Sequence, residues 1–245
     1  MKKTIVALFA LAGMAMGAES TIIPAGCTLE EVWSIDFGSE YGTGTDAYEL
    51  TGTLANKGTF WDMVEVEGGV QTSSAKRVHL AGGVYGSWDE DFQFSMSLTL
   101  GNADGVISAS NNWPVFGEIG GSGAYVRFGP YTAMENKVAL DGDLTKDNNN
   151  NLVAVEAGKT YTITLTKIGT NVVVAVDGVA TGYGTLADSV TGNITDVVLG
   201  GDRNGNYKIN QVVHNISWSK IVPEPATATL SLLALAGLAA RRRRA

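Results

Sequence analysis

A nine-residue segment, Phe92 to Leu100, constrains the fold of this chain more than any other part of it. Five large apolar side chains alternate there with four small polar ones. Successive side chains of a β-strand point to opposite faces of the sheet, so the alternation predicts a strand with one buried and one solvated face. A slip of one residue would expose all five apolar groups, and the register is therefore strongly specified. The apolar set, expected inside, is Phe92, Phe94, Met96, Leu98 and Leu100.

The rest of the chain between residues 19 and 221 shows the same alternation of apolar and polar residues. Thr160 to Thr166 alternates threonine with larger apolar residues, and Asp177-Gly178 after Val172 to Val176 is a two-residue hairpin signal. Further strands are expected at Asp196 to Leu199 and at Val212 to Trp218, ending before the prolines at 223 and 225. Short strands separated by Gly, Asn and Asp predict an all-β fold, a two-sheet antiparallel β-sandwich, as a single domain over residues 19–221.

Composition excludes several classes of protein. Cys27 is the single cysteine among 245 residues, so an intrachain disulfide and a cysteine-rich metal site are both excluded. The two ends, Lys2 with Lys3 and Arg241 to Arg244, hold six of the 17 basic residues, which leaves 11 basic against 25 acidic residues, a net charge of −14. Nucleic-acid binding requires a basic surface, so nucleic acid is not expected as a partner.

The N-terminus, residues 1–18, has the pattern of a secretory signal peptide. Lys2 and Lys3 precede an apolar run from Ile5 to Ala12, and small residues follow it. We expect export by the Sec machinery as a signal helix, with cleavage after Gly17 or Ala18.

The C-terminal segment, residues 222–245, predicts a membrane anchor. Ala226 to Ala240 carries no charge and is followed by Arg241 to Arg244. As a helix this stretch would reach about 22 Å, short of the roughly 30 Å hydrocarbon core, although snorkelling arginines reduce the mismatch. Because positive charge stays in the cytoplasm, the arginines would remain inside while the body lies outside.

The same segment resembles the PEP-CTERM sorting domain, in the form common in Verrucomicrobia. The resemblance rests on Pro223, Glu224 and Pro225, a short Ala/Leu stretch and the terminal Arg241, Arg242, Arg243 and Arg244. It implies recognition by an exosortase-type enzyme in a Gram-negative bacterium, an inner-membrane intermediate, cleavage near the Pro-Glu-Pro motif, and delivery to the cell surface or extracellular matrix. A plain C-terminal anchor is the alternative, with the same topology.

Residues 85–220 resemble LamG-like, concanavalin A-like jelly-roll domains. The similarity is carried by the segment from Trp88 to Leu98, by Ala157 to Leu165 with the Asp177-Gly178 turn, and by Leu199-Gly200-Gly201 with the strand ending at Trp218. That family includes lectins, glycan-binding modules and some glycoside hydrolases, so the fold does not by itself select a function.

A hydrolytic function finds little support. A retaining glycosidase needs two carboxylates about 5 to 5.5 Å apart, and its laminarinase-type members carry Glu-x-Asp-x-x-Glu on one strand. Glu65-Val66-Glu67 lacks the central aspartate, and the adjacent Glu90 and Asp91 would point to opposite faces of a strand. We therefore expect a protein that is not an enzyme, with a divergent glycoside hydrolase as the third-ranked alternative.

Ligand binding is the favoured function. Sugar recognition needs an aromatic platform beside polar groups that read hydroxyls. Two tryptophans, Trp33 and Trp218, fall in strand-like runs and are expected in the core, whereas three others fall near Gly, Asn, Asp or Pro. The candidate ligand-binding residues are Trp61, Trp88, Trp113, Gln93, Ser95 and Ser97.

Calcium is the candidate cofactor, and two oxygen-rich loops are its candidate sites. Asp141 with Asp143, and Asp202 with Asn204, offer the oxygen ligands that a hard cation prefers. Neither loop has the full spacing of a calcium-binding loop, and turns stabilised by Asx side chains explain the same residues without an ion.

These observations favour an exported, surface-sorted, non-enzymatic binding domain for a glycan or matrix polymer. A structural component of the envelope or extracellular matrix without a small ligand is the second reading.

Overall fold

The computed structural model describes residues 22–37, 51–52, 64–72, 78–80, 83–108, 114–121, 123–131, 136–148, 153–202, 204 and 206–224. All regular structure in these ranges is β, as the alternation predicted, and no helix occurs in them. The expected signal helix (1–18) and the C-terminal apolar helix with its arginines lie outside these residues. No helix long and apolar enough to cross a membrane is found in the described part of the chain.

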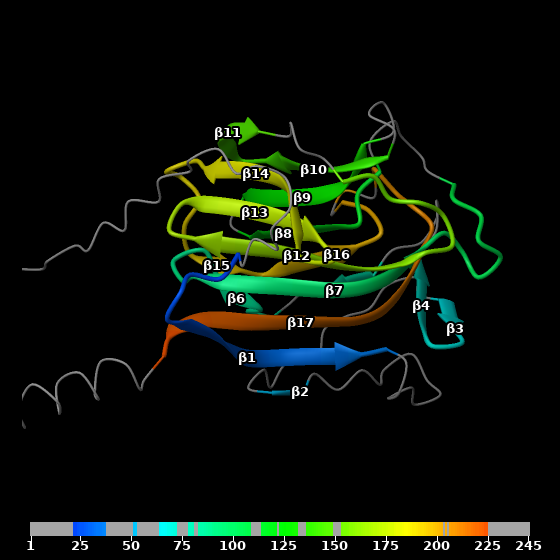
Figure 1. Ribbon diagram of the computed structural model, residues 1–245, viewed down its shortest axis with the longest axis horizontal. Helices are drawn as coiled ribbons and strands as arrows, with labels where there is room; N and C mark the ends of the chain where they lie inside the picture. Colours follow the sequence, from blue (N-terminus) through cyan, green and yellow to red (C-terminus); the bar gives the residue numbers. More distant parts are fainter. Residues whose placement is uncertain are drawn as a thin grey trace, which may run out of the picture.

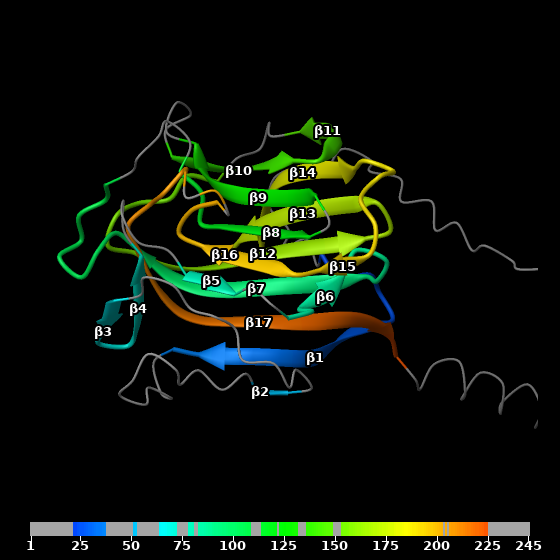
Figure 2. The same cartoon turned by 180° about the vertical axis from the view of Figure 1, so that it is seen from behind.

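The strands form two large antiparallel sheets and one small one (Figures 1 and 2). The larger sheet has the order β11-β14-β13-β12-β7-β17-β1-β2, with β3 and β4 joined to it through β17, and the smaller has the order β10-β9-β8-β16-β5. The pair β15-β6 stands apart. The bounds are β1 Cys27–Asp36, β2 Thr51–Gly52, β3 Val64–Val66, β4 Gly69–Thr72, β5 Val78–Leu80, β6 Gly86–Ser87, β7 Phe92–Leu100, β8 Gly117–Gly121, β9 Ala124–Tyr131, β10 Lys137–Gly142, β11 Leu144–Asn148, β12 Thr160–Ile168, β13 Asn171–Val176, β14 Val179–Leu186, β15 Asn193–Ile194, β16 Asp196–Leu199 and β17 Gln211–Pro223.

Strand β7 has the register that its sequence predicts. Its five apolar side chains are buried and its four polar ones are half-buried, in strict alternation. The strand lies at the centre of the larger sheet, where β12 pairs with it on one side and β17 on the other. Burying each large apolar side chain is worth about 1.5–3 kcal/mol, so the five together fix this register.

The core lies between the two sheets, which pack as a β-sandwich. Phe94 of β7 contacts Phe128 of β9 with 6.2 Å between ring centroids, joining the larger sheet to the smaller. Trp33 and Trp218, both expected in the core, are 0% and 1% exposed and stack on each other. Phe92 also stacks on Trp218, with 4.1 Å between the ring centroids.

The predicted hairpin between β13 and β14 is confirmed. Asp177 and Gly178 have positive φ values of 49° and 80°, the backbone that a two-residue turn of this kind requires. The strand expected at Asp196 to Leu199 is also present with those bounds, as β16.

Strand β17 is longer than predicted and includes the first proline. It was expected at Val212 to Trp218, ending before the prolines, yet it spans Gln211–Pro223, and Pro223 pairs with Cys27 at the start of β1. A proline is tolerated there because β17 has β1 as its one neighbour at this end, since its pairing with β7 ends at Lys220. The Glu224 N–H then donates to the Gly26 carbonyl at 2.9 Å, so β1 begins and β17 ends side by side (Figure 1).

Candidate functional site

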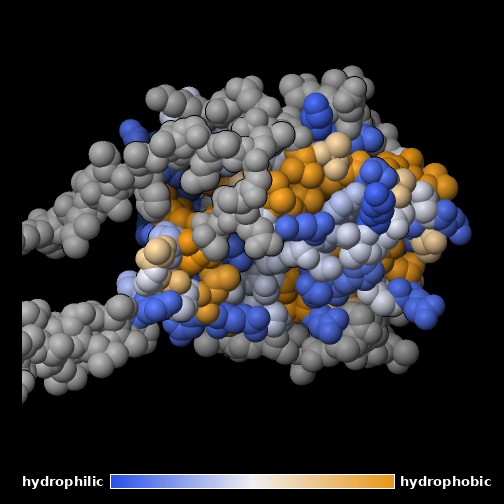
Figure 3. Space-filling model, in the orientation of Figure 1, coloured by the Kyte–Doolittle hydropathy of each residue, from blue (hydrophilic) through white to orange (hydrophobic). Residues whose placement is uncertain are grey.

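The outer face of the larger sheet carries short hydroxyl side chains in register; we call it the hydroxyl face. Ser95 and Ser97 of β7 lie directly opposite Thr164 and Thr162 of β12. Gln93 donates from Nε2 to Thr166 Oγ1 at 3.0 Å. The uncovered centre of the same side is pale in Figure 3, as weakly polar residues are. The structure thus places Gln93, Ser95 and Ser97 together on one solvated face, as alternation requires.

The structure describes only one of the three candidate tryptophans. Trp88 follows β6 and is 2% exposed, with its ring 5.8 Å from that of Phe92. A buried ring offers no open face to a sugar, so Trp88 serves the core. The polar residues after it suggested an exposed loop, but the turn that they form directs the indole inward. Trp61 and Trp113 lie outside the described residues.

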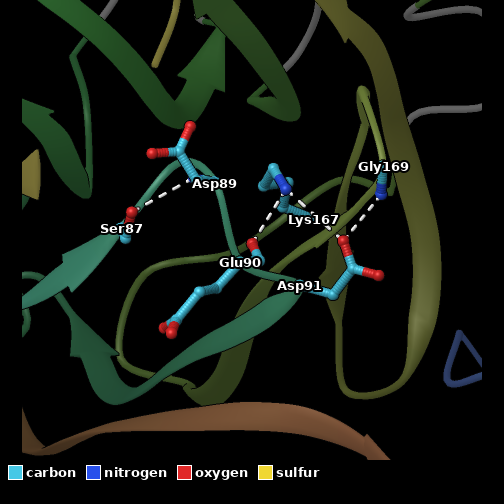
Figure 4. A network of polar contacts seen from close by, with 6 residues as sticks. All are labelled: Ser87, Asp89, Glu90, Asp91, Lys167 and Gly169. Atoms are coloured by element: carbon cyan, nitrogen blue, oxygen red, sulfur yellow. Dashed lines mark hydrogen bonds and ion pairs between the residues drawn. The ribbon is translucent and has the colours of Figure 1, made fainter. Parts of the chain in front are cut away.

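The acidic turn between β6 and β7 is held by structural contacts (Figure 4). Lys167 donates to the Glu90 carbonyl at 2.8 Å and lies 3.4 Å from Asp91, which also accepts the Gly169 N–H. The Glu90 side chain turns away from Lys167 in Figure 4 and bonds to Lys220 at 2.8 Å. Asp89 accepts the Gly192 N–H. Each carboxylate is therefore engaged by its own protein donor.

The candidate calcium residues likewise bond to protein donors. Asp143 accepts the Tyr125 N–H at 2.7 Å, and Asp141 accepts from Arg127. Asp202 accepts the Asn206 N–H, which closes an Asx-type turn. Asn204 is exposed in that loop. Among the described residues no group of three or more His, Cys, Asp or Glu gathers as a metal site.

Sequence analysis did not select Arg127 of β9, which contacts Asp141 of the first loop and lies against Tyr207, just after the second. Its Nε donates to Asp141 Oδ2 at 2.7 Å and its Nη2 contacts the same oxygen. The guanidinium carbon lies 4.3 Å from the Tyr207 ring centroid and 5.2 Å from that of Tyr125. Arg127, Tyr125, Tyr207 and Asp141 form what we call the arginine cluster, on the outer face of the smaller sheet. A guanidinium is thus the cation that faces Asp141.

The backbone at Tyr207 is unusual. Its φ is 52°, in the left-handed region that bulky residues rarely adopt. Such a conformation costs on the order of 1–3 kcal/mol and tends to occur at functional positions. Its carbonyl accepts the Val115 N–H at 2.9 Å, which fixes the backbone while the ring lies over Arg127.

Charge and burial adjust the protonation of the cluster. Burial raises the pKa of Tyr125, the negative charges of Asp141, Asp143 and Glu118 raise it further, and Arg127 opposes them. Burial is the largest single effect on Arg127 and would lower its pKa. The hydrogen bond to Asp141, the negative charge of Asp141 and smaller effects of Tyr125 and Tyr207 together outweigh burial, so the pKa of Arg127 is raised. At neutral pH the cluster therefore presents the neutral Tyr125 phenol beside a fully charged guanidinium.

Polar groups continue across the same face. Glu118 of β8 pairs with Arg127 of β9, which pairs with Asp141 of β10, so the three form one row. Beyond β8 in the same sheet, His79 of β5 and Asp196 of β16 lie side by side, with 2.8 Å between His79 Nε2 and Asp196 Oδ1. The smaller sheet thus carries charged and aromatic residues where the larger carries hydroxyls.

Sequence reasoning could have found part of this cluster. Residues 124–128 alternate Ala, Tyr, Val, Arg and Phe, which places Tyr125 and Arg127 on the solvated side of a strand. Tyr207 gave no such signal, because its contact with Arg127 depends on how a distant loop returns to the sheet.

No family model and no curated protein matches the chain. Solved structures resemble it in fold. A Trypanosoma rangeli sialidase in complex with the inhibitor DANA matches with a TM-score of 0.53 and 13% identity, over 77% of this chain and 30% of the sialidase chain. Domain 4 of AbnA, a GH43 extracellular arabinanase from Geobacillus stearothermophilus solved in complex with arabinotriose, matches with a TM-score of 0.50 and 14% identity, over 82% of this chain and 97% of that domain. The chain thus spans less than a third of the sialidase, and at these identities the likeness concerns the β-sandwich fold alone.

Proposed function

We propose that this chain is a non-enzymatic binding domain whose ligand is a glycan or a matrix polymer, bound at the arginine cluster. The observation that carries the proposal is the pair of tyrosine rings, Tyr125 and Tyr207, held against Arg127 on one sheet face. Both tyrosines are half-buried, so part of each ring reaches solvent.

The chemistry of the cluster suits a polyhydroxylated ligand. Aromatic rings offer a rigid apolar surface with a polar tip, on which the C–H face of a sugar can rest. The Asp141 carboxylate beside them is partly exposed and can accept hydroxyl hydrogen bonds. Because Asp141 and Arg127 orient each other, both would be preorganised before the ligand arrives.

The fold supports the same proposal. The arabinanase domain was solved with arabinotriose, and the similarity covers nearly all of that domain. We further infer that the body is a concanavalin A-like, LamG-like jelly roll, in which glycan binding would be carried by the sheet face and its loops.

The absence of catalysis is part of the proposal. The carboxylates of the acidic turn and of the arginine cluster accept hydrogen bonds from protein donors: Lys220 for Glu90, the Gly169 N–H for Asp91 and Arg127 for Asp141. Carboxylates held in such contacts support a structural role for these residues rather than a catalytic one.

Export and sorting complete the proposal. The signal peptide would direct Sec export, and the PEP-CTERM-like segment would hold the chain at the inner membrane until an exosortase-type enzyme passes it to the cell surface or matrix. Support comes from the pairing of Cys27 with Pro223, which brings the attachment points of both signals to one end of the body.

The test compares two half-buried strand tyrosines on opposite sheets, Tyr125 of β9 and Tyr183 of β14. Purified protein is applied to a panel of immobilised polysaccharides, arabinan included. We expect Tyr125→Thr to weaken binding about tenfold, the equivalent of about 1.4 kcal/mol of lost contact. Tyr183→Thr should leave it unchanged. Binding to no polysaccharide, or loss with Tyr183→Thr alone, would overturn the proposal.

A further inference from the structure

Three hydrogen bonds in a chain cross one end of the hydroxyl face. His214 Nδ1 lies 2.6 Å from the Gly68 carbonyl oxygen, and His214 Nε2 lies 2.7 Å from Thr99 Oγ1. Thr99 Oγ1 in turn lies 2.7 Å from Thr160 Oγ1. The four residues come from the β3–β4 turn, β17, β7 and β12, so the chain joins segments that are distant in sequence (Figure 1).

A β-bulge in β17 brings the imidazole into this chain. The register of β17 against β7 shifts between Val213 and Asn215, so His214 is the extra residue there. Bulges redirect a side chain and occur preferentially beside functional positions. His214 is half-buried, so its ring can exchange protons with water.

The chemistry of the four groups fixes the direction of every bond while His214 is neutral. A carbonyl oxygen can only accept, so His214 Nδ1 must carry the single ring N–H. Nε2 therefore accepts from the Thr99 hydroxyl, and Thr99, with its one hydrogen in use, accepts from Thr160. Thr160 is exposed, and its oxygen is left with lone pairs alone. It can accept a hydrogen bond from a ligand but cannot donate one.

A second proton on His214 reverses the chain and needs no heavy atom to move. Nε2 then donates to Thr99, Thr99 donates to Thr160, and the Thr160 hydrogen is directed to solvent. Nδ1 still donates to the Gly68 carbonyl, so each group keeps its partner in both states. Bonds from an imidazolium are also charge-assisted, which strengthens the reversed chain.

We propose that His214, Thr99 and Thr160 form a proton-switched relay that sets the hydrogen-bonding polarity of the hydroxyl face at Thr160. With His214 neutral, Thr160 takes ligand groups that donate, such as hydroxyl or ammonium groups. With His214 protonated, it takes groups that accept, such as carboxylate oxygens. Histidine suits this role because its charge generally changes between about pH 5 and pH 8. The relay lies on the larger sheet and is independent of binding at the arginine cluster.

Charged residues adjoin the relay on several of the described elements. Glu67 precedes Gly68 in the β3–β4 turn, and Asp36 of β1 pairs with Asn215, next to His214. Glu156 and Lys159, whose charged groups lie 2.9 Å apart, precede Thr160. The outward residues of β7 nearest to the relay, Ser97 and Thr99, are uncharged. A test must therefore separate proton transfer along the relay from the titration of these neighbours.

The test uses the full chain labelled with ¹⁵N and ¹³C and observed by NMR from about pH 5 to about pH 8. His79 and His214 are the two histidines of the chain, and His79→Gln identifies the His214 signals. At the upper end of this range Nδ1 of His214 should carry the proton and Nε2 should not. The Thr160 Cβ shift should follow the His214 titration, whereas that of Thr162, the next outward residue of β12, should not.

Variants at Thr99 show whether the hydroxyl carries the effect. Thr99→Val keeps the β-branched shape and removes the connecting hydroxyl, so the Thr160 response should be lost while His214 still titrates. Thr99→Ser restores the hydroxyl and should restore the response. Ser97→Ala, at the next outward position of β7, is the matched control and should change neither signal.

Two results would overturn the relay. One is a neutral His214 that carries its proton on Nε2, and the other is a Thr160 response that persists in Thr99→Val, since a nearby charge would then cause it. Neither measurement involves a polysaccharide, so failure of the relay and failure of binding at the arginine cluster are separate outcomes.

Discussion

The two outer faces of the sandwich are made in different ways. The hydroxyl face of β7 and β12 is built from residues in register on neighbouring strands, with Ser97 opposite Thr162 and Ser95 opposite Thr164. The arginine cluster combines one strand residue pair, Tyr125 and Arg127, with Asp141 of the next strand and with a loop. The hydroxyl face repeats one kind of side chain along its strands, whereas the arginine cluster brings a guanidinium, a carboxylate and two aromatic rings together.

That difference bears on function. Repeated short hydroxyl side chains make a uniform surface. They follow from the alternation of side chains along each strand and need no contact with distant segments of the chain. A guanidinium between two tyrosines requires a strained backbone at Tyr207 and a half-buried ion pair, both of which cost free energy. Costly arrangements persist where they serve a purpose, and for this reason our proposal places ligand binding at the arginine cluster.

The largest expected effect separates the inner from the outer side of β7. Leu98→Asp places a carboxylate at a position that is 0% exposed, between Tyr161 of β12 and Val213 of β17. We expect a loss of about 5 kcal/mol or more, comparable with the whole stability of a domain, and therefore an unfolded protein. Circular dichroism and urea unfolding measure it.

The control for this variant is its neighbour, Ser97→Asp, on the hydroxyl face. It should change the free energy of unfolding by less than about 1 kcal/mol, because the new carboxylate remains in water. A folded Leu98→Asp protein, or equal losses from both variants, would contradict the register of β7.

A second prediction concerns the ion pair of the arginine cluster. Asp141→Asn removes the carboxylate charge that faces the guanidinium of Arg127, whose side chain is 11% exposed. We expect a loss of about 2 kcal/mol, below the 3–5 kcal/mol of a fully buried pair because Asp141 is itself 34% exposed. Thermal unfolding of Asp141→Asn and of Asp188→Asn, an exposed turn residue, gives the comparison. Equal stability of the two variants would show that the pair contributes nothing.

The contrast between the faces explains what the sequence could predict. Alternation is a local property, so the burial of Phe94 and Leu98, the solvated position of Ser95 and the Asp177-Gly178 turn all follow from neighbouring residues. These features were enough to predict the fold class and the strand Phe92 to Leu100. The strand order, with β7 between β12 and β17, was not predicted because pairing of distant strands leaves no local pattern.

The candidate site was less predictable for a related reason. Asp141, Asp143 and Asp202 were selected because they are oxygen-rich, but the cation that faces Asp141 is Arg127, 14 residues earlier in the chain. Trp88 was selected because polar residues follow it, yet its ring packs on Phe92. In each case the partner that decides the role belongs to another segment.

A third prediction uses pH to compare the faces. The pKa of Tyr125 is raised by burial and by its acidic neighbours, so the fold favours the neutral phenol. The resulting stabilisation is complete below the unfolded pKa of about 10 and is lost as pH rises through the higher folded value. Tyr125→Phe should therefore show a smaller alkaline loss of stability than the wild type, measured by urea unfolding at a series of alkaline pH values. If the wild type and Tyr125→Phe lost stability equally with rising pH, ionisation of Tyr125 would not contribute to the alkaline loss.

The smallest effect is expected on the hydroxyl face itself. Thr99 Oγ1 and Thr160 Oγ1 lie 2.7 Å apart on neighbouring strands, and Thr99 also contacts His214 Nε2 at 2.7 Å. Thr160→Val keeps the β-branched shape and removes one exposed hydrogen bond, so we expect a loss of about 0.5 kcal/mol. Thr162→Val, at the next outward position of β12, is the control and should lose less. Because the bond joins two neutral groups, the loss should not change with salt, in contrast to that of Asp141→Asn. Urea unfolding at low and high salt measures both, and a salt-dependent loss for Thr160→Val would show that charge acts on this face as well.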